Sequence, residues 1–310
     1  MTHAFVFPGQ GSQTVGMLAD LGAAFPIVKQ TFEQASEVLS YDLWKLSQEG
    51  PEETLNQTDK TQPALLAAGV AVWRVWQQQG GSDPIFMAGH SFGEYSALVC
   101  ASALQFTDAV SLAQDRGRFM QTAVPEGEGA MAAILGLDDA KVIEICKQAA
   151  QEEIVSAVNF NAPGQIVIAG HTAAVKRATA LAKAAGAKRA ILLQVSVPAH
   201  SHLMQPAAEK MAERLVKVSI TPPLIPVIHN VDVTQKSEAA DIRAALTAQL
   251  YNPVRWVETI EKMAAEGVTT LFECGPGKVL SGLNKRIVRK MVTKPMMDTK
   301  RLEQALEALL

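Results

Sequence analysis

A serine between two glycines is the first group in the sequence that could do chemistry. Residues 85–95 read IFMAGHSFGEY, and GHSFG fits the pattern G-x-S-x-G, which places a nucleophilic serine on a sharp strand-to-helix turn. Neighbouring side chains would clash in so tight a turn, so glycine is expected on both flanks of Ser91. The hydroxyl then lies at a helix N-terminus, where backbone N–H groups favour a developing negative charge. The alternative is a serine that only caps the helix.

A nucleophilic serine needs a base to take its proton, and the sequence offers six histidines. Four of them are explained by their place next to the serine or in or beside predicted strands: His3, His90, His171 and His229. His90 in particular is expected to point away from Ser91 and to pack or cap. His200 and His202, in VPAHSHLM, follow a predicted strand at a natural edge for a cleft. From the residues alone, His200 is one candidate base.

Strands and helices alternate along the chain in a way that would position this serine. It follows a predicted strand at 84–89 and precedes a predicted helix at 91–102. An earlier strand at 3–7 leads into the glycine-rich loop PGQGSQ. Further helices are predicted at 62–79 and 107–124. Short β-rich runs between longer helical segments indicate an α/β fold with a mainly parallel sheet.

The middle of the chain has a different order of elements. The pattern there predicts a strand, a helix, two strands, a helix and a strand, which is the ferredoxin-like βαββαβ arrangement. These elements are expected at 130–136, 138–151, 154–160, 165–170, 173–185 and 188–196. Asn161 falls in the turn NAPG between the two central strands, where a turn role would explain it.

Helix–strand alternation returns after this segment, with strands near 225–229 and 269–273. We therefore expect a large α/β-hydrolase-like domain with a parallel sheet, formed by residues 1–125 and 199–310. A small ferredoxin-like subdomain, residues 126–198, is inserted into it.

Composition excludes several classes of function. The 28 basic and 31 acidic residues give a formal charge of −3, so no strong field favours nucleic acid or an anionic membrane. The apolar run at 64–73 is too short to span a bilayer, and the N-terminus lacks the features of a signal peptide. We expect a cytoplasmic protein. Cys100, Cys146 and Cys274 show no CxxC spacing, which argues against a disulfide framework or a metal site.

Nine short stretches, spread over nearly the whole chain, form a pattern far more specific than any one of them. They are FPGQGSQ (7–13), TQPAL (61–65), GHSFGEYSAL (89–98), DRGRFMQ (115–121), NFNAPGQIVIAG (159–170), VSVPAHSHLM (195–204), NVDV (230–233), LYNPVRW (250–256) and ECGPGKVL (273–280). In content and order, the chain resembles the malonyl-CoA:acyl-carrier-protein transacylases of fatty acid synthesis, and above all their free-standing bacterial members.

The resemblance implies roles for individual residues. Ser91 would be the acylated nucleophile, His200 the general base and then the acid, and the backbone carbonyl of Gln249 would orient the histidine. The oxyanion hole would consist of the backbone N–H groups of Gln10 and Phe92. This gives the glycine-rich loop a function, whereas from the residues alone we would interpret it as a turn.

Arg116, in DRGRFMQ, is implied to bind the free carboxylate of a malonyl group. A planar guanidinium can hold a carboxylate through two charge-assisted hydrogen bonds. An acetyl group would leave the buried cation unpaired, so the residue would act as a specificity filter. A salt bridge with Asp115 or a neighbouring helix is the alternative, and the residues alone favour it. Met120 and Asn161 are implied to line the same cleft.

Two positions depart from the family pattern. Phe92 stands where leucine is usual; its role is through the backbone N–H, so we expect catalysis to survive with altered packing. Ala199 precedes the base, and a small residue there does not separate malonyl from methylmalonyl preference. Branched extender units therefore stay open as substrates.

The implied reaction is ping-pong transfer of a malonyl group from malonyl-CoA to the phosphopantetheine thiol of acyl carrier protein. It requires no metal or redox cofactor, and we expect a monomer. Acyl carrier proteins are acidic, so basic residues around the cleft would dock them. The candidates in KVLSGLNKRIVRK are Lys278, Lys285, Arg286, Arg289 and Lys290. A solvated helix face is the alternative explanation for these charges.

Two other functions stay open. An α/β-hydrolase, either an esterase or a thioesterase, shares the G-x-S-x-G pattern but should carry an Asp or Glu between serine and histidine in chain order. Such residues do occur in that interval, so order alone does not exclude this function, although the insertion and Arg116 argue against it. The second is a non-enzymatic module that binds a carrier protein or acyl-CoA with an inactive serine.

Overall fold

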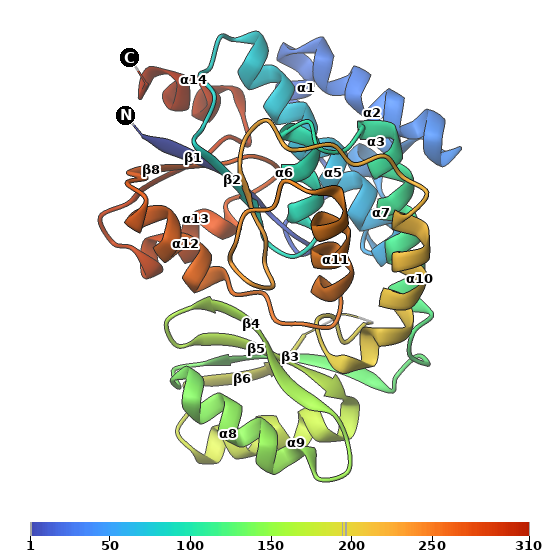
Figure 1. Ribbon diagram of the computed structural model, residues 1–310, viewed down its shortest axis with the longest axis vertical. Coiled ribbons are helices and arrows are strands. Elements are labelled where there is room, and N and C mark those ends of the chain that lie inside the picture. Colours follow the sequence, from blue (N-terminus) through green and yellow to red (C-terminus); the bar gives the residue numbers. More distant parts are fainter. Residues whose placement is uncertain (1, 194, 196, 310) are drawn as a thin grey trace.

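Two sheets organise the chain (Figure 1). The structure is a computed structural model that describes residues 2–193, 195 and 197–309. The larger sheet is parallel and has, in spatial order, β7 (Val227–Ile228), β2 (Phe86–Gly89), β1 (His3–Phe7), β8 (Thr270–Glu273) and β9 (Val292–Pro295). The smaller sheet is antiparallel and has β4 (Val155–Ala162), β5 (Gln165–His171), β3 (Gly129–Leu135) and β6 (Arg189–Leu192). The predicted α/β fold is confirmed.

Helices cover both faces of the parallel sheet and one face of the antiparallel sheet (Figure 1). Those outside the small sheet are α1 (Ala19–Ala24), α2 (Pro26–Leu39), α3 (Leu43–Glu49), α4 (Glu52–Leu55), α5 (Thr58–Gln78), α6 (Gly93–Cys100), α7 (Phe106–Gln121), α10 (Gln205–Leu215), α11 (Ala239–Gln249), α12 (Trp256–Ala265), α13 (Val279–Ile287) and α14 (Thr299–Glu307). A 3-10 turn, His202–Met204, precedes α10. The small sheet carries α8 (Asp139–Ala150) and α9 (Thr172–Ala184).

Strand β1 shows why the parallel sheet is buried on both sides. Its side chains alternate between the two faces, as in any strand. Phe5 and Phe7 pack in the core that includes α2, α5 and α7, whereas Ala4 and Val6 pack with α12 and α13. All four are fully buried. A run of five buried residues is therefore what a central parallel strand requires.

The small sheet is built as predicted from a βαββαβ order of elements. Helices α8 and α9 pack on the face that points away from the large sheet (Figure 1). Its edge strand β4 meets the chain between α11 and α12: Phe160 N–H donates to the Val254 carbonyl at 3.0 Å, and Val254 N–H donates to the Val158 carbonyl at 2.8 Å. The division of the chain at residues 125–126 and 198–199 stays a prediction.

Several element boundaries differ from those predicted. Strand β4 runs through Asn161 to Ala162, so the prediction that Asn161 lies in a turn is wrong. Pro163 and Gly164 alone make that turn, because Gly164 adopts the left-handed conformation with φ 68°. The strand predicted at 188–196 is described only as β6, and residues 194 and 196 lie outside the described residues.

Three findings bear on the classes of function considered above. Within the described residues, no helix combines the length and the apolar character that crossing a membrane requires. The three cysteines are buried and unpaired. In the same part of the chain, no cluster of three or more histidine, cysteine or acidic side chains could hold a metal ion.

Candidate active site

Strand β2 ends in the sharp turn predicted at Ser91. This residue has φ 52°, a left-handed conformation that is strained for a side chain other than glycine. A Cβ atom on Gly89 would lie 1.8 Å from the carbonyl carbon of Gly93, and one on Gly93 would lie 2.1 Å from the carbonyl oxygen of Phe7. Glycine is therefore required on both flanks because backbone approaches backbone, as the sequence pattern predicts.

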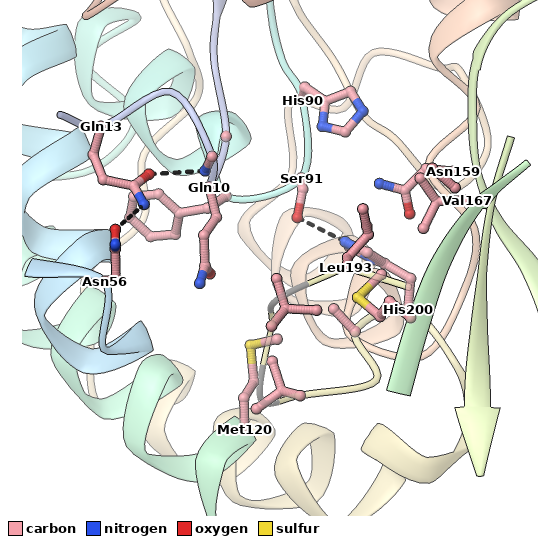
Figure 2. Close-up of a pocket in the computed structure, with 18 of the residues that line it drawn as sticks. Gln10, Gln13, Asn56, His90, Ser91, Met120, Asn159, Val167, Leu193 and His200 are labelled. Atoms are coloured by element: carbon pink, nitrogen blue, oxygen red, sulfur yellow. Dashed lines mark hydrogen bonds between the residues drawn. The ribbon is translucent and has the colours of Figure 1, made fainter. Parts of the chain in front are cut away.

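The structure brings Ser91 and His200 together. The Oγ of Ser91 lies 2.6 Å from Nε2 of His200 (Figure 2). On the other side of the ring, Nδ1 donates a hydrogen bond to the backbone carbonyl of Gln249 at 2.7 Å, at the end of α11. Because a carbonyl only accepts, this bond places the proton on Nδ1 and leaves Nε2 free to accept from the serine hydroxyl.

The surroundings of His200 keep its imidazole neutral. Its side chain is buried, and this burial is the main reason why the pKa of His200 falls to about 3, with the positive charge of Arg116 as a second cause. The carbonyl of Gln249 acts in the opposite direction and raises the pKa. A neutral imidazole in contact with a serine hydroxyl can accept its proton.

The loop after β1 lies directly on the serine turn, because a Cβ atom on Gly9 would lie 2.5 Å from the backbone oxygen of His90. Gln10, Ser91 and Phe92 all line one cavity, and Figure 2 shows Gln10 and Ser91 in it. Across the described residues, the backbone N–H groups of Gln10 and Phe92 have no hydrogen-bond partner. The loop is held in place by Gln13, which accepts from Gly11 N–H and donates to the Asn56 side chain, both at 2.8 Å. Two unpaired N–H groups beside a serine suit an oxyanion.

Arg116 of α7 lines the same cavity, whose volume is about 1200 Å³. Its side chain is 1% exposed, and its Nη2 donates to the side-chain oxygen of Gln249 at 2.9 Å. Its Nε has no partner in the described part of the chain. Asp115 turns away and pairs with Arg214 at 2.7 Å, so the predicted alternative, a salt bridge between Asp115 and Arg116, is not formed.

Met120 and Asn161 also line the cavity, as the resemblance implies. The Oδ1 of Asn161, from the small sheet, lies 2.7 Å from Nε2 of His90, next to the serine. His90 packs edge-on against Trp256 with ring centres 5.4 Å apart, which agrees with a packing role. However, His90 also lines the cavity beside Ser91, which the sequence did not predict (Figure 2).

The two departures from the family pattern both contact the site. The ring of Phe92 stacks on Tyr95 at 5.4 Å between ring centres, and it lies 5.8 Å from the guanidinium carbon of Arg116. A larger aromatic side chain therefore packs against the cation, while the backbone N–H of Phe92 stays free. Ala199 lines the cavity next to His200.

A buried polar network behind the serine was missed by sequence reasoning. Asn230 accepts from Ser91 N–H at 2.7 Å and donates to the Gly89 carbonyl at 2.6 Å, so its amide clamps both sides of the turn. Glu94 accepts from Nδ1 of His229 and from Asn230 N–H at 2.7 and 2.9 Å. The signal in the sequence was a charged residue, Glu94, in a short helix whose other residues are small or apolar.

The five basic residues predicted to dock a carrier protein are all exposed. Helix α13, which carries two of them, also contributes Val279 and Leu283 to the cavity wall. Arg286 has an additional role: it donates to the Pro163 carbonyl at 3.1 Å and to the side chain of Gln165. It therefore ties α13 to the turn between β4 and β5.

Comparison with known proteins identifies the family. The acyl transferase domain model matches residues 4–301. The malonyl CoA-acyl carrier protein transacylase of Escherichia coli K12 is 60% identical over 304 residues, 98% of each chain. The solved transacylase of Coxiella burnetii superposes with a TM-score of 0.99 at 53% identity, over 100% of this chain and 98% of that one. A malonyl-transacylase solved in complex with a type II PKS acyl-carrier protein superposes with a TM-score of 0.98 at 58% identity. The match covers 99% of this chain and 100% of that one. The chain belongs to the acyl transferase domain family.

Proposed function

We propose that this protein transfers the malonyl group of malonyl-CoA to the phosphopantetheine thiol of acyl carrier protein and so supplies fatty acid synthesis. The observation that carries the proposal is a serine–histidine pair, 2.6 Å apart, in one cavity with a buried arginine that faces no carboxylate among the described residues. The names of the relatives and the solved complex with a carrier protein point to the same substrates.

In the first half-reaction, Oγ of Ser91 attacks the thioester carbonyl of malonyl-CoA while Nε2 of His200 takes the hydroxyl proton. The tetrahedral oxyanion accepts hydrogen bonds from the N–H groups of Gln10 and Phe92. The C–S bond then breaks, and His200 returns its proton to the leaving thiolate. The products are free coenzyme A and a malonyl ester of Ser91.

The second half-reaction runs the same steps in reverse with another thiol. His200 takes the proton of the phosphopantetheine thiol, and the thiolate attacks the carbonyl of the serine ester. The oxyanion again accepts hydrogen bonds from the N–H groups of Gln10 and Phe92. The C–O bond to Ser91 breaks, and the proton on His200 passes to the serine oxygen. The activated acyl group is already a thioester, so no step requires a metal or redox cofactor.

Arg116 selects the acyl group. Its unpaired Nε and its Nη atoms can hold the free carboxylate of the malonyl group through two hydrogen bonds. An acetyl group has no carboxylate to accept hydrogen bonds from this buried cation and leaves it partly unsatisfied.

The proposal includes that the enzyme is cytoplasmic and acts as a monomer. Gel filtration would test the oligomeric state against the chain's mass of 33.2 kDa.

The carrier protein docks, in this proposal, on the exposed cations of α13 and its ends. Helix α13 carries Val279 and Leu283 into the cavity wall, so Lys285 stands on an element that borders the entrance. Lys285→Gln should raise the apparent KM for the carrier protein several-fold and leave acylation by malonyl-CoA unchanged. Lys217→Gln, an exposed cation after α10, is the matched control. Unchanged carrier-protein kinetics in Lys285→Gln would remove this surface from the proposal.

The hydrolase alternative predicts a carboxylate on Nδ1 of the base. A backbone carbonyl, that of Gln249, takes this position at 2.7 Å, and the nearby carboxylate of Glu94 contacts His229 instead. This arrangement favours a two-residue pair over a hydrolase triad. The inactive binding module is disfavoured because the base lies within hydrogen-bond distance of the serine.

The test is the complete reaction. Purified protein is mixed with malonyl-CoA and holo acyl carrier protein, and malonyl-carrier protein, free malonate and free coenzyme A are quantified over time. We expect one malonyl-carrier protein for each coenzyme A released, little malonate, and no product with apo carrier protein. Malonate release that is independent of the carrier protein would show a thioesterase, and binding without turnover would show an inactive module.

A further inference from the structure

Glu94 is a fully buried carboxylate three residues after the nucleophile, and three donors converge on it. Oε1 accepts from Nδ1 of His229 at 2.7 Å. Oε2 accepts from the backbone N–H of Asn230 and from Nε2 of Gln249, both at 2.9 Å. No side chain in this cluster is more than 1% exposed, so water does not screen the charge.

Gln249 joins this carboxylate to Arg116. Its Nε2 donates to Glu94 and to the backbone carbonyl of Ser91, both at 2.9 Å. Because both partners are acceptors, Nε2 must face them, and the amide oxygen must then face the other way. That oxygen accepts from Nη2 of Arg116 at 2.9 Å. The side chain of Gln249 therefore spans from anion to cation, while its backbone carbonyl holds His200.

Arg116 has no direct ionic partner in the part of the chain that the structure describes. Two neighbouring cations do have an ionic partner. Arg118 on the same helix and Arg214 on α10 both lie within ion-pair distance of Asp115. Burial, the largest cause, lowers the pKa of Arg116, and electrostatic interactions with Tyr95 and Glu94 raise it. The charge of the cation is thus partly compensated from a distance, and its Nε stays without a hydrogen-bond partner among the described residues.

We propose that Glu94 is the counter-charge of Arg116, kept one amide away by Gln249, and that this spacing sets how strongly the pocket selects an acyl group with a free carboxylate. A carboxylate in direct contact would satisfy Arg116 and exclude the substrate. A cation with no counter-charge would be costly to bury. Glu94 is therefore a positioning residue that acts through Gln249. The inference rests on the proposed function, because it assumes a malonyl group on Arg116.

Two substitutions move this charge in opposite directions. Gln249→Glu puts a carboxyl group against Arg116 and keeps the backbone carbonyl that holds His200. It also removes the donor to Glu94 and to the Ser91 carbonyl, which is why acylation by acetyl-CoA has to be measured beside it. Glu94→Gln removes the charge and can keep the geometry, because Nε2 of His229 has no partner in the described structure. The imidazole can therefore move its proton to Nε2 and accept from the new amide through Nδ1 without losing a hydrogen bond. The amide oxygen still accepts from Asn230 and Gln249.

The experiment measures the acylation rate constants of Ser91 by malonyl-CoA and by acetyl-CoA, and takes their ratio. Damage to the serine turn slows acylation by acetyl-CoA as well as by malonyl-CoA. The ratio of the two rate constants therefore reports only the effect of the substrate's free carboxylate. We expect Gln249→Glu to lower the malonyl-to-acetyl ratio about 100-fold. We expect Glu94→Gln to raise it about threefold or more, since the remaining cation attracts the carboxylate more strongly.

Glu273→Gln is the matched control. Glu273, the last residue of β8, is as buried as Glu94 and caps α13 by accepting from Leu280 and Ser281 N–H at 2.9 and 2.7 Å. Its loss should lower the melting temperature and leave the ratio unchanged. A change of the ratio in the same direction in both test variants, or no change in either, would overturn the proposal and leave Glu94 a structural residue.

The outcomes separate this inference from the proposed function. If the wild-type protein forms no malonyl ester, the function itself is wrong. If it does, and Gln249→Glu keeps the wild-type ratio, only the inference fails. If Glu94→Gln does not fold, Gln249→Glu decides the question alone.

Discussion

The two sheets bury their polar groups in different ways. In and around the parallel sheet, the chain buries ionisable groups to 1% exposure or less: Glu94, Arg116, His229 and Glu273. In the small sheet and its helices α8 and α9, the buried polar residues among those described are neutral: Asn159, Asn161 and Thr179. Crevices at the carboxyl ends of parallel strands are the usual position of ligand sites in such folds. The difference suggests that the large sheet supplies the charges for the chemistry and the small sheet covers them.

The largest effect should follow from removing the base that contacts Ser91. In His200→Ala, the serine hydroxyl loses the acceptor that lies 2.6 Å away. We expect acylation by malonyl-CoA to slow by about 10³-fold or more, measured by rapid quench and intact mass. His202→Ala, an exposed histidine two residues on, is the control and should acylate normally. Wild-type rates in His200→Ala would contradict the proposed role.

The next effect concerns acyl-group choice. Arg116→Met removes the cation and roughly keeps the side-chain length, so the pocket loses its affinity for a carboxylate. We expect the malonyl-to-acetyl ratio of acylation rates to fall about 100-fold, mainly through malonyl-CoA. Arg118→Met, exposed on the same helix, should keep the wild-type ratio. An unchanged ratio in Arg116→Met would mean that another group reads the carboxylate.

The pKa of His200 links the site to stability. The folded chain does not protonate this histidine until pH about 3, whereas the unfolded chain does so near its ordinary pKa of about 6.5. The unfolded state therefore binds more protons between these values, and the free energy of unfolding falls as pH falls from 6.5. His200→Gln should remove about 1.6 kcal/mol of this loss between pH 6.5 and 5, measured by urea unfolding. An equal loss in variant and wild type would show that His200 titrates normally.

The smallest effect should come from the small sheet. Asn161→Ala removes the hydrogen bond to His90 across the cleft, 2.7 Å long, but no charge. We expect acylation to slow about fivefold, since one neutral hydrogen bond at the cover is lost. Thr179→Ala, equally buried on α9 and not among the residues that line the cavity, should have no effect on the rate. If Asn161→Ala slowed acylation as much as His200→Ala, the small sheet would contribute as much to the chemistry as the large sheet, which would contradict the comparison.

Local patterns predicted the parts of the site that depend on near neighbours in the chain. The glycines around Ser91 and the strand at 3–7 follow from steric and periodic rules, and both agree with the structure. The family resemblance, and not the spacing, singled out His200 among six histidines, because its partner lies 109 residues away. The same resemblance placed Arg116 in the cleft, against the Asp115 salt bridge that the residues alone favour.

Long-range polar contacts could not be read from the sequence. Asn230 and Gln249 reach Ser91 from 139 and 158 residues away, and no periodicity encodes such pairs. Asn161 was assigned to a turn because Pro163 and Gly164 follow it, yet pairing of β4 with β5 continues through Ala162. Pairing between β4 and β5 in the folded protein, and not the local turn preference, therefore set the end of β4.

The most direct test of the account is the covalent intermediate on Ser91. Protein mixed with malonyl-CoA alone is examined by intact mass spectrometry and peptide mapping, beside acetyl-CoA, methylmalonyl-CoA and Ser91→Ala. The account predicts a malonyl ester on Ser91 that is absent in Ser91→Ala and much weaker with acetyl-CoA. The methylmalonyl sample shows whether the small residue Ala199 admits a branched group. A protein that turns over malonyl-CoA without an adduct at Ser91 would contradict the central claim.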